Sequence, residues 1–265
     1  MHVSIKHLLD YKTCPQMYKF RHVDMLPEKA DIARAFRLAL RKTISFYYFS
    51  LMEQKKPSLH DLMGRWEKVW FSKQIEETFL QDEIRERSNA AVGLIRNFHR
   101  YARVDKEVPV AIDFRYEALF EGEVNLHVSG NIDLIRVVND KTRNKEVHLV
   151  FFSYSRYHPS DFLSQIDLNT TLASYAFRKG FKEKEDKIVL CNIGKKQESA
   201  VLRTGNDFER CRKICYNIVS GIENKIFYPA DNYINCKKCN FRTFCINEKA
   251  MEDRNGISKE LDNRR

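Results

Sequence analysis

The sequence predicts a mixed α/β protein with a central mixed sheet flanked by helices. Three observations support this fold class. Apolar residues recur at helical spacing through residues 30–101, and β-branched residues alternate with polar ones after residue 107. Helical and strand-like segments then follow one another up to about residue 225. The 265 residues, 43% of them hydrophobic, are sufficient for a sizeable core.

The first expected elements are two short helices followed by a longer helical region. Residues 4–13 begin with Ser4, a favoured N-cap residue, and carry apolar residues on one helical face. The Cys14-Pro15 pair begins a second helix, because proline suits the first helical position. Residues 30–101 are then expected to form a helical insertion ahead of the sheet.

The sheet core is expected over residues 107–195. Its strands are predicted from β-branched and aromatic residues in alternating or continuously apolar runs. Strands are expected at 108–120, 124–140, 145–155 and 186–194, and helices at 161–178 and 207–225. The third strand, KEVHLVFFSYS, is apolar enough to be central. Residues 251–265 are strongly charged and are expected to form a frayed tail.

Charge and apolar content limit the function classes. The formal net charge of +10 and the pI of about 9.2 favour a polyanionic partner, of which nucleic acid is the usual one. The basic residues are scattered, so the fold must assemble any binding face. No apolar run approaches the roughly 20 residues of a membrane span. The N-terminus lacks an apolar signal core, so we expect a cytoplasmic protein in a reducing compartment.

Three of the seven cysteines fall within the ten residues CKKCNFRTFC. Cys236, Cys239 and Cys245 have the spacing C-x2-C-x5-C, and the first pair is typical of zinc and iron–sulfur sites. A closed site needs a fourth ligand. Cys14 is the best candidate, since a helix N-terminus favours the thiolate form that binds metal. The spacing alone leaves both zinc and a four-iron cluster open.

The remaining cysteines are interpreted as core residues. Cys191 lies on an apparently buried strand, and Cys211 and Cys215 are four residues apart on one helix face. His148, in the middle of a strand, is interpreted as structural. A metal site joining residue 14 to residue 236 would restrict the unfolded chain, so metal binding and folding would be coupled.

Two segments of the chain resemble a known family. SIKHLLDYKTCPQMYKF and IFYPADNYINCKKCNFRTFC resemble the RecB-like nucleases of the PD-(D/E)XK superfamily that carry an iron–sulfur cluster, including the AddB C-terminal domain and the CRISPR adaptation exonucleases. The resemblance implies one nuclease-like domain over residues 1–250, with the segments 1–25 and 226–250 binding the cluster. It implies a [4Fe-4S] cluster held by Cys14, Cys236, Cys239 and Cys245, with zinc as the alternative.

The same resemblance implies a nuclease centre that departs from the family pattern. The family holds Mg²⁺ with carboxylates on adjacent strands, because hard cations prefer oxygen ligands. GNIDLI resembles the family's Gly-x-Ile-Asp segment and implies that Asp133 is a metal ligand. The next strand should carry Asp/Glu-x-Lys, but the chain has Phe152-Ser153-Tyr154 there. A phenyl ring cannot coordinate Mg²⁺ and a neutral phenol supplies no fixed cation, so we expect impaired catalysis.

Other positions of the nuclease pattern are also altered. Phe36 and Leu40 stand where the family has Gly-x-x-x-His, and Gln165 is followed by Asn169 where the family has Gln-x-x-x-Tyr. Gln165 is therefore a second candidate catalytic residue. The acids nearby in sequence are expected to be solvated surface charges: Glu117, Glu146, Asp161 and Asp167.

Three functions are compatible with the sequence. The first is a catalytically impaired nuclease-fold protein that binds DNA, as single strands or ends, or serves as a structural subunit in DNA repair or recombination. Tyr154, Arg156 and Tyr157 are its candidate DNA-binding residues, with ordinary sheet packing as the alternative. The second is an active Mg²⁺- or Mn²⁺-dependent DNA exonuclease with relocated metal ligands. The third is a scaffold that binds proteins and does not contact DNA.

Overall fold

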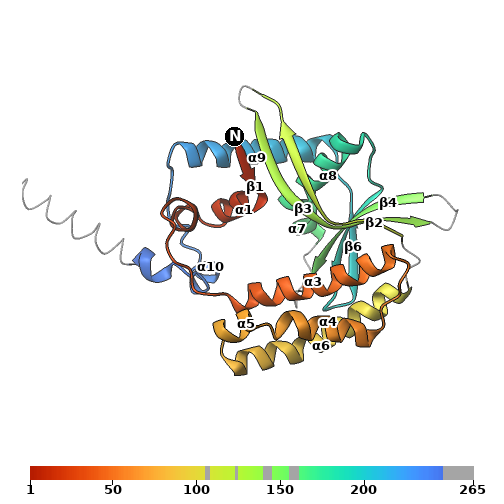
Figure 1. Ribbon diagram of the computed structural model, residues 1–265. Helices are drawn as coiled ribbons and strands as arrows, with labels where there is room; N and C mark the ends of the chain where they lie inside the picture. The colour runs from red at the N-terminus through yellow and green to blue at the C-terminus, as the bar shows by residue number, and fades with distance from the viewer. Residues whose placement is uncertain (105–107, 123–124, 140–144, 155–160, 247–265) are drawn as a thin grey trace, which may run out of the picture. The chain divides into compact units, whose positions relative to one another are not determined.

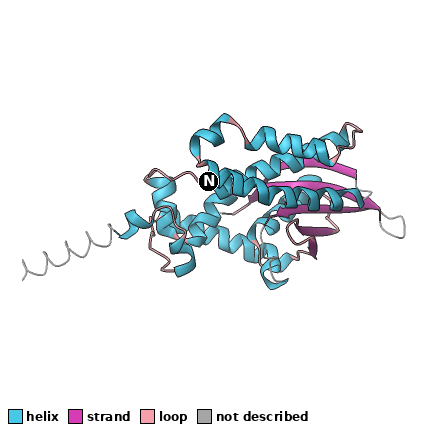
Figure 2. Cartoon of the chain, turned by 90° about the horizontal axis from the view of Figure 1, so that it is seen from below, coloured by secondary structure: helices cyan, strands magenta, loops and turns pink. Residues whose placement is uncertain are grey.

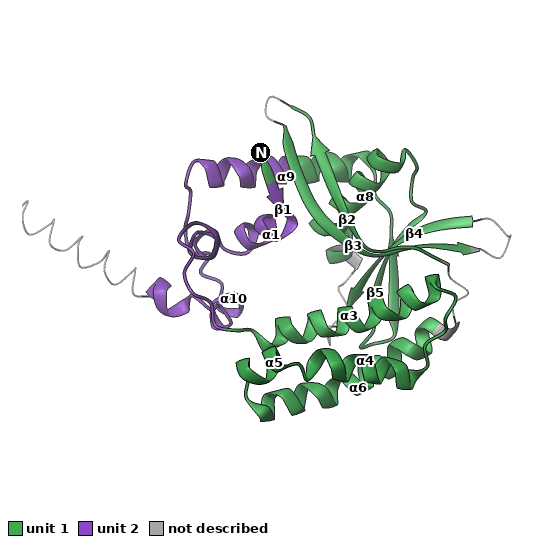
Figure 3. Ribbon diagram, in the orientation of Figure 1, with its two compact units in different colours: residues 1–2, 30–212 green, residues 3–29, 213–265 purple. Residues whose placement is uncertain are grey.

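The protein is described by a computed structural model, which covers residues 1–104, 108–122, 125–139, 145–154 and 161–246. The chain divides into two compact units, coloured separately in Figure 3. Unit 1 comprises residues 1–2 and 30–212, and unit 2 comprises residues 3–29 and 213–265. The charged tail expected at residues 251–265 lies outside the described part of the chain.

Unit 1 begins with the helical region expected from the sequence, which is confirmed as four helices. They are α3 (Ile32–Met52), α4 (Leu59–Trp70), α5 (Lys73–Thr78) and α6 (Gln81–Val104). Asp31 caps α3 by accepting a hydrogen bond from the Ala33 N–H, and Ser58 forms a capping box at the start of α4. Within this unit α4 lies alongside both α3 and α6 (Figure 1).

The sheet of unit 1 is mixed, which confirms the predicted fold class. Its strands are β1 (His2–Ser4), β2 (Val108–Phe120), β3 (Leu126–Asn139), β4 (Lys145–Ser153), β5 (Lys187–Asn192) and β6 (Gln197–Val201). Their order is β1-β3-β4-β5-β6, with β2 paired to β3, and of β1 only His2 belongs to unit 1. The β4–β5 pair is parallel, whereas the β2–β3, β3–β4 and β5–β6 pairs are antiparallel. The short strands β1 and β6 were not predicted.

Helices cover the sheet of unit 1 (Figure 2). The single helix predicted at residues 161–178 is divided into α7 (Asp161–Gln165) and α8 (Leu168–Phe181). The division falls at Asp167, whose side chain caps α8 by accepting from the Thr170 N–H at 2.8 Å. Tyr175 of α8 stacks on Phe120 of β2 with ring centroids 4.7 Å apart.

A core cluster of unit 1 lies between α3, α4, α6 and strands β3 to β5. Trp66 and Trp70 are fully buried and stack with centroids 5.2 Å apart. Burying each such ring contributes about 2–3 kcal/mol. Cys191 of β5 is buried in this cluster, as predicted. His148 is buried as well, with its Nε2 2.8 Å from a Glu146 carboxylate oxygen.

Unit 2 contains the two short N-terminal helices predicted from the sequence. They are α1 (Ile5–Thr13), which begins with a Ser4 capping box, and α2 (Pro15–Tyr18), which continues as a π-helix, η1 (Lys19–Val23). The C-terminal part of α9 (Gly205–Glu223) and α10 (Tyr233–Lys237) complete the unit. The Tyr11 hydroxyl donates to the Ile226 carbonyl at 2.7 Å and so ties the two ends of the chain together.

The cysteines of α9 are both buried, as predicted: Cys211 is 2% exposed and Cys215 is fully buried. None of the seven cysteines, all of which lie in the described residues, forms a disulfide. Among the helices of the described chain, none combines the length and apolar character that crossing a bilayer requires.

Candidate functional site

Two facing strands of unit 1 place a pair of acidic residues at the position of the expected nuclease centre. Asp133 lies on β3, and Asp113 lies on β2 between the residue pairs Ile112↔Leu134 and Phe114↔Ile132. This register sets the two acids across from each other. Like charges facing each other in a sheet are destabilising, so the pair requires a compensating cation.

Asp113 also has an unusual backbone conformation. Its φ angle is 51°, in the left-handed region, which aspartate tolerates better than most residues. Ile112, on one side of Asp113, packs against the α3–α6 core, whereas the ring of Phe114, on its other side, packs 5.7 Å from that of Phe181 in α8. In a regular strand Ile112 and Phe114, two residues apart, would point to the same face. The left-handed conformation of Asp113 instead directs them to different helices. Left-handed residues of this kind concentrate at functional sites.

Arg41 of α3 supplies the compensating cation. Its Nε lies 2.6 Å from Asp113 Oδ1, and its Nη2 lies 3.0 Å from Asp133 Oδ1. The remaining oxygens also accept hydrogen bonds at 2.8 Å, from the Ser45 hydroxyl to Asp113 and from the Phe152 N–H to Asp133. Burial raises the pKa of Asp133, and the Arg41 charge and the Phe152 N–H only partly offset this rise.

A pocket of about 270 Å³ opens beside Asp133. Its basic residues are Arg34, Arg37 and Arg41, which follow one face of α3 at helical spacing. Asp133 is the one acidic residue among the described lining residues, and its charge is already paired with Arg41. The full lining is Arg34, Arg37, Leu38, Arg41, Asn131, Asp133, Phe151, Phe152, Tyr154 and Asn169. We call this the arginine pocket, and its charge suits an anion rather than a divalent cation.

The two positions that replace the family's Asp/Glu-x-Lys both line the arginine pocket and both pack against the core cluster. The ring of Phe152 stacks on Tyr48 at 6.1 Å and meets Phe98 edge-on at 6.2 Å. The side chain of Tyr154 carries the one hydroxyl of the pair. Burial, followed by the charge of Asp133, raises its pKa well above that of a free phenol. Its hydroxyl is therefore neutral, and neither position supplies a metal ligand or a fixed cation.

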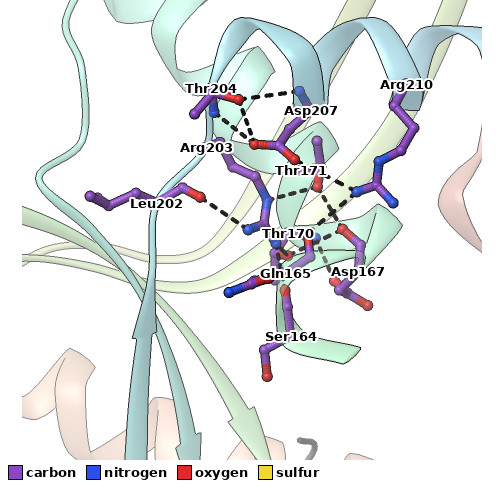
Figure 4. Close-up of polar contacts among 10 residues, drawn as sticks. All are labelled: Ser164, Gln165, Asp167, Thr170, Thr171, Leu202, Arg203, Thr204, Asp207 and Arg210. Atoms are coloured by element: carbon purple, nitrogen blue, oxygen red, sulfur yellow. Dashed lines mark hydrogen bonds and ion pairs between the residues drawn. The ribbon is translucent and has the colours of Figure 1, made fainter. Parts of the chain in front are cut away.

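Gln165 is placed away from the arginine pocket. It is the last residue of α7, it is exposed, and its backbone carbonyl accepts a hydrogen bond from Arg210 Nη2 at 3.3 Å (Figure 4). It is not among the described residues that line the pocket, whereas Asn169, four residues later, is. The structure therefore brings Asp133, Tyr154 and Asn169 to one pocket, without Gln165.

The α7–α8 segment is held by a buried arginine (Figure 4). Arg203 is 2% exposed, and its guanidinium donates to the Ser164 carbonyl at 2.7 Å and to the Thr170 and Thr171 hydroxyls at 2.8 Å. Burial lowers the pKa of this guanidinium. Because its near partners are neutral oxygens, it acts through hydrogen bonds that fix the start of α8, and with it Asn169.

The remaining candidates of the nuclease region are elsewhere. Arg156 and Tyr157 lie outside the described residues. Glu146 pairs with Lys187 at 2.6 Å, Asp167 caps α8, and Glu117 lies beside His127. The side chain of Asp161 also lies outside the described part of the chain. None of these acids lines the arginine pocket as described.

The predicted cluster ligands come together within unit 2. Cys14, Cys236, Cys239 and Cys245 line one cavity of about 190 Å³, with Met17, Phe20 and Phe241 among its apolar walls. Cys14 caps α2, and its Sγ accepts a hydrogen bond from the Met17 N–H at 3.4 Å. We call this the cysteine cavity.

Local hydrogen bonds shape the loop that carries the three late cysteines. The Asn232 side chain caps α10 by accepting from two backbone N–H groups, so Cys236 lies on the first turns of this helix. The Cys239 N–H then donates to the Cys236 carbonyl at 3.3 Å, and the Cys245 N–H to the Phe241 carbonyl at 3.0 Å. Phe241 is fully buried and packs on Phe20, which anchors the loop against the N-terminal segment.

The cysteine cavity disfavours the ionised form of Cys239. Burial raises the pKa of Cys239, and the neighbouring Cys14 and Cys236 raise it further, while the Phe241 N–H and Arg21 lower it. A metal ion bound there would reverse this effect, because a coordinated thiol is deprotonated. No three of the four sulfur atoms lie mutually within 4.8 Å. Four thiolates around one zinc ion would stand about 3.8 Å apart, from Zn–S bonds of about 2.3 Å.

A comparison with family models identifies the superfamily of the chain. The family model described as "PD-(D/E)XK nuclease superfamily" matches residues 2–246. The chain therefore belongs to the PD-(D/E)XK nuclease superfamily. A solved structure described as "Crystal structure of SSO0001" is similar, with 13% identity and a TM-score of 0.37, over 82% of this chain and 97% of that chain. No match was found among the curated proteins.

The sequence analysis did not identify the three arginines of the arginine pocket, or Asp113, which contacts Arg41. Arg34, Arg37 and Arg41 were visible as a stripe at spacings of three and four in RAFRLALR. Asp113 was visible as a lone charge within the apolar run VAIDF. Neither signal is specific, because charge stripes are usual on solvated helix faces. Asp113 comes to lie opposite Asp133 only because β2 pairs with β3, and Arg41 then contacts both acids.

Proposed function

We propose that this chain is an iron–sulfur-containing, RecB-like protein of the nuclease superfamily that does not hydrolyse phosphodiesters. Instead it binds DNA, as single strands or ends, within a DNA-processing complex. The observation that carries the proposal is the contact between Arg41 and Asp133. A guanidinium engages the oxygen that a divalent metal would need, in a pocket lined by two further arginines.

The loss of hydrolysis follows from ligand chemistry. Mg²⁺ prefers near-octahedral oxygen coordination and is usually held by one or two carboxylates together with substrate phosphates. Asp133 would have to release Arg41 before it could bind the metal. The adjacent strand offers Phe152 and a neutral Tyr154, so the metal would gain no further ligand there.

DNA binding is supported by the groups left available in the arginine pocket. Arg34 and Arg37 are exposed at its rim, and Asn131 and Asn169 add amide groups. Guanidinium groups form bidentate hydrogen bonds with phosphate oxygens, and aromatic side chains such as Tyr154 stack on bases. The formal net charge of +10 would add long-range attraction.

The iron–sulfur part of the proposal is supported by the cysteine cavity. Four cysteines from two distant segments of the chain line it, and the late three have the C-x2-C-x5-C spacing. A [4Fe-4S] cluster would link Cys14 to the late cysteine loop and stabilise unit 2. Zinc is the alternative occupant, and a measurement of acid-labile sulfide separates the two.

One preparation tests the proposal. The protein, purified without oxygen, is incubated with labelled single-stranded DNA and Mg²⁺ or Mn²⁺, and DNA affinity is measured across a salt series. We expect no cleavage, and an affinity that falls steeply with salt. Each phosphate contact contributes a slope of about 0.7 for single strands in a plot of log affinity against log salt. Arg34→Gln and Arg37→Gln should each lower this slope by about that amount.

Arg85→Gln is the matched control, because Arg85 is exposed on α6 and does not line the pocket. It should leave the salt slope unchanged. Metal-dependent cleavage by the unmodified protein would overturn the loss of hydrolysis. Absence of DNA binding at low salt would overturn the DNA-binding role and favour a scaffold that contacts only proteins.

A second candidate, the metal-dependent exonuclease, is favoured by one specific observation. Asp113 faces Asp133 across β2 and β3, and both contact the same guanidinium. If Arg41 moved aside, the two carboxylates would offer oxygen ligands from adjacent strands. Asp113 would then be the relocated ligand, and cleavage would require it.

A further inference from the structure

We propose that His2, Glu117 and His127 form a binding site for a divalent transition-metal ion of the zinc type. In the described chain, these are the one group of three or more candidate ligands whose donor atoms all lie within 4.8 Å of one another. The site belongs to unit 1 and is independent of both the arginine pocket and the cysteine cavity.

The sheet explains why Glu117 and His127 meet. In β2, Tyr116, Ala118 and Phe120 are buried while Glu117 is exposed between them. In β3, Leu126 and Val128 are buried on either side of His127. The register pairs Glu117 with Ser129 and Leu119 with His127, so Glu117 and His127 are diagonal neighbours on the outward face.

Two backbone hydrogen bonds bring His2 to the same place. The Met1 amino group donates to the Asn125 carbonyl at 2.8 Å, and the His127 N–H donates to the Met1 carbonyl at 2.9 Å. The imidazoles of His2 and His127 then stack with centroids 4.1 Å apart and an interplanar angle of 20°.

The three donor atoms lie close together. Glu117 Oε1 lies 2.7 Å from His127 Nδ1 and 3.5 Å from His2 Nδ1. Bonds of about 2.0–2.2 Å around a tetrahedral zinc ion place its ligand atoms about 3.3–3.6 Å apart. A metal ion lies in the plane of each imidazole that binds it, so the stacked rings would rotate apart on binding, which the exposed His2 side chain permits. Two imidazoles and one carboxylate form a ligand set that suits zinc and related divalent ions.

All three groups can turn a lone pair toward a shared cation, because a neutral imidazole has one unprotonated ring nitrogen and a carboxylate only accepts. A metal ion bound to all three atoms would take the place of the protons that now lie between them. It leaves a fourth coordination position open, and it clamps the first residues of the chain onto β3.

Cobalt(II) distinguishes this site from the cysteine cavity. Thiolate-bound cobalt gives strong charge-transfer absorption, whereas cobalt bound by nitrogen and oxygen gives only weak d–d bands. We titrate Co²⁺, and Zn²⁺ in competition with it, into the full chain whose iron–sulfur content has been measured. We expect one equivalent bound without thiolate bands. Removing a direct ligand by His127→Asn or Glu117→Gln should weaken this binding at least about 100-fold.

Two controls make the result specific. Ser129→Ala changes the residue that pairs with Glu117 and removes no ligand, so it should bind the ion normally. His2→Gln should lose binding without affecting folding, because the His2 side chain is 74% exposed. Equal binding by all variants, or no thiolate-free binding at all, would overturn the proposal.

Discussion

The arginine pocket and the cysteine cavity are built from different kinds of information. The cysteine cavity is formed by a short motif, with three of its four ligands within ten residues and the fourth at a helix start. The arginine pocket is formed by a helix stripe and two facing strands, with no local motif. In one region four thiols line a cavity, and in the other a guanidinium pairs with both acids at the expected nuclease centre. The proposed function separates the two regions, because it assigns a metal role to the cysteine cavity and none to the arginine pocket.

The largest expected effect tests the cysteine cavity. Cys239→Ser removes one of the four proposed ligands in the cavity, and we expect it to abolish most iron and sulfide binding. A bound cluster would couple metal binding to folding, so its loss should destabilise unit 2 by on the order of 5 kcal/mol. Iron and sulfide assays with urea unfolding measure both effects. Cys211→Ala is the control, since Cys211 is a buried core residue, and it should lower stability while retaining iron.

The second effect concerns a part of unit 1 that is held by side-chain hydrogen bonds. Arg203→Lys cannot reproduce the hydrogen bonds to Ser164, Thr170 and Thr171, so buried oxygens lose their donors. We expect a loss of about 2–4 kcal/mol in the free energy of unfolding, with iron content unchanged. A fall in iron content equal to that of Cys239→Ser would contradict the independence of the two regions.

The third effect tests the charge of the arginine pocket. Arg41→Met leaves Asp113 and Asp133 facing each other without a cation, which should cost about 1–2 kcal/mol after allowance for solvent exposure. Mn²⁺ should then stabilise the variant and not the unmodified protein, as measured by thermal unfolding with and without the ion. Arg41→Met with Asp113→Asn is the matched control, and it should lose the Mn²⁺ response. An Mn²⁺ response already present in the unmodified protein would favour the exonuclease.

The two regions also differ in how far the sequence predicted them. The grouping of Cys14 with the late cysteines was visible because metal chelation imposes spacing on the chain. The replacement of the Asp/Glu-x-Lys positions by Phe152 and Tyr154 was equally visible. The role of Arg41 was not, because it depends on a left-handed residue in β2 and on the register between two strands. Periodicity predicts elements, but it does not predict which helix side chain reaches which strand.

The same limit explains the errors in the fold. The strands at 108–120 and 124–140 were predicted closely because their alternation reports a half-buried sheet face. The break between α7 and α8 was missed, since Asp167 lies inside a helical pattern and acts as a cap only through its contact with the Thr170 N–H. The strand β6, QESAV, was missed because an edge strand with exposed residues carries little apolar signal.

The smallest expected effect concerns contacts that hold the cysteine loop without metal. The Arg21 guanidinium donates to both carboxylate oxygens of Glu28, at 2.7 and 2.9 Å, and lies over the Phe241 ring. These hydrogen bonds lower the pKa of Glu28. A lowered pKa stabilises the fold above the unfolded carboxyl value of 4.5, and this stability is lost as pH falls through the lower folded value.

Glu28→Gln should therefore cost about 0.5 kcal/mol at pH 7, and the difference from the unmodified protein should vanish in acid. Urea unfolding at pH 7 and pH 3 measures the change, with Glu53→Gln as control, because the exposed pair of Glu53 and Lys55 should contribute nothing measurable. If instead the difference did not shrink at any pH below 4.5 at which the protein still folds, the carboxylate would not be its source. A retained cluster in Glu28→Gln would further show that thiol ligation, more than this ion pair, holds the loop to the N-terminal segment.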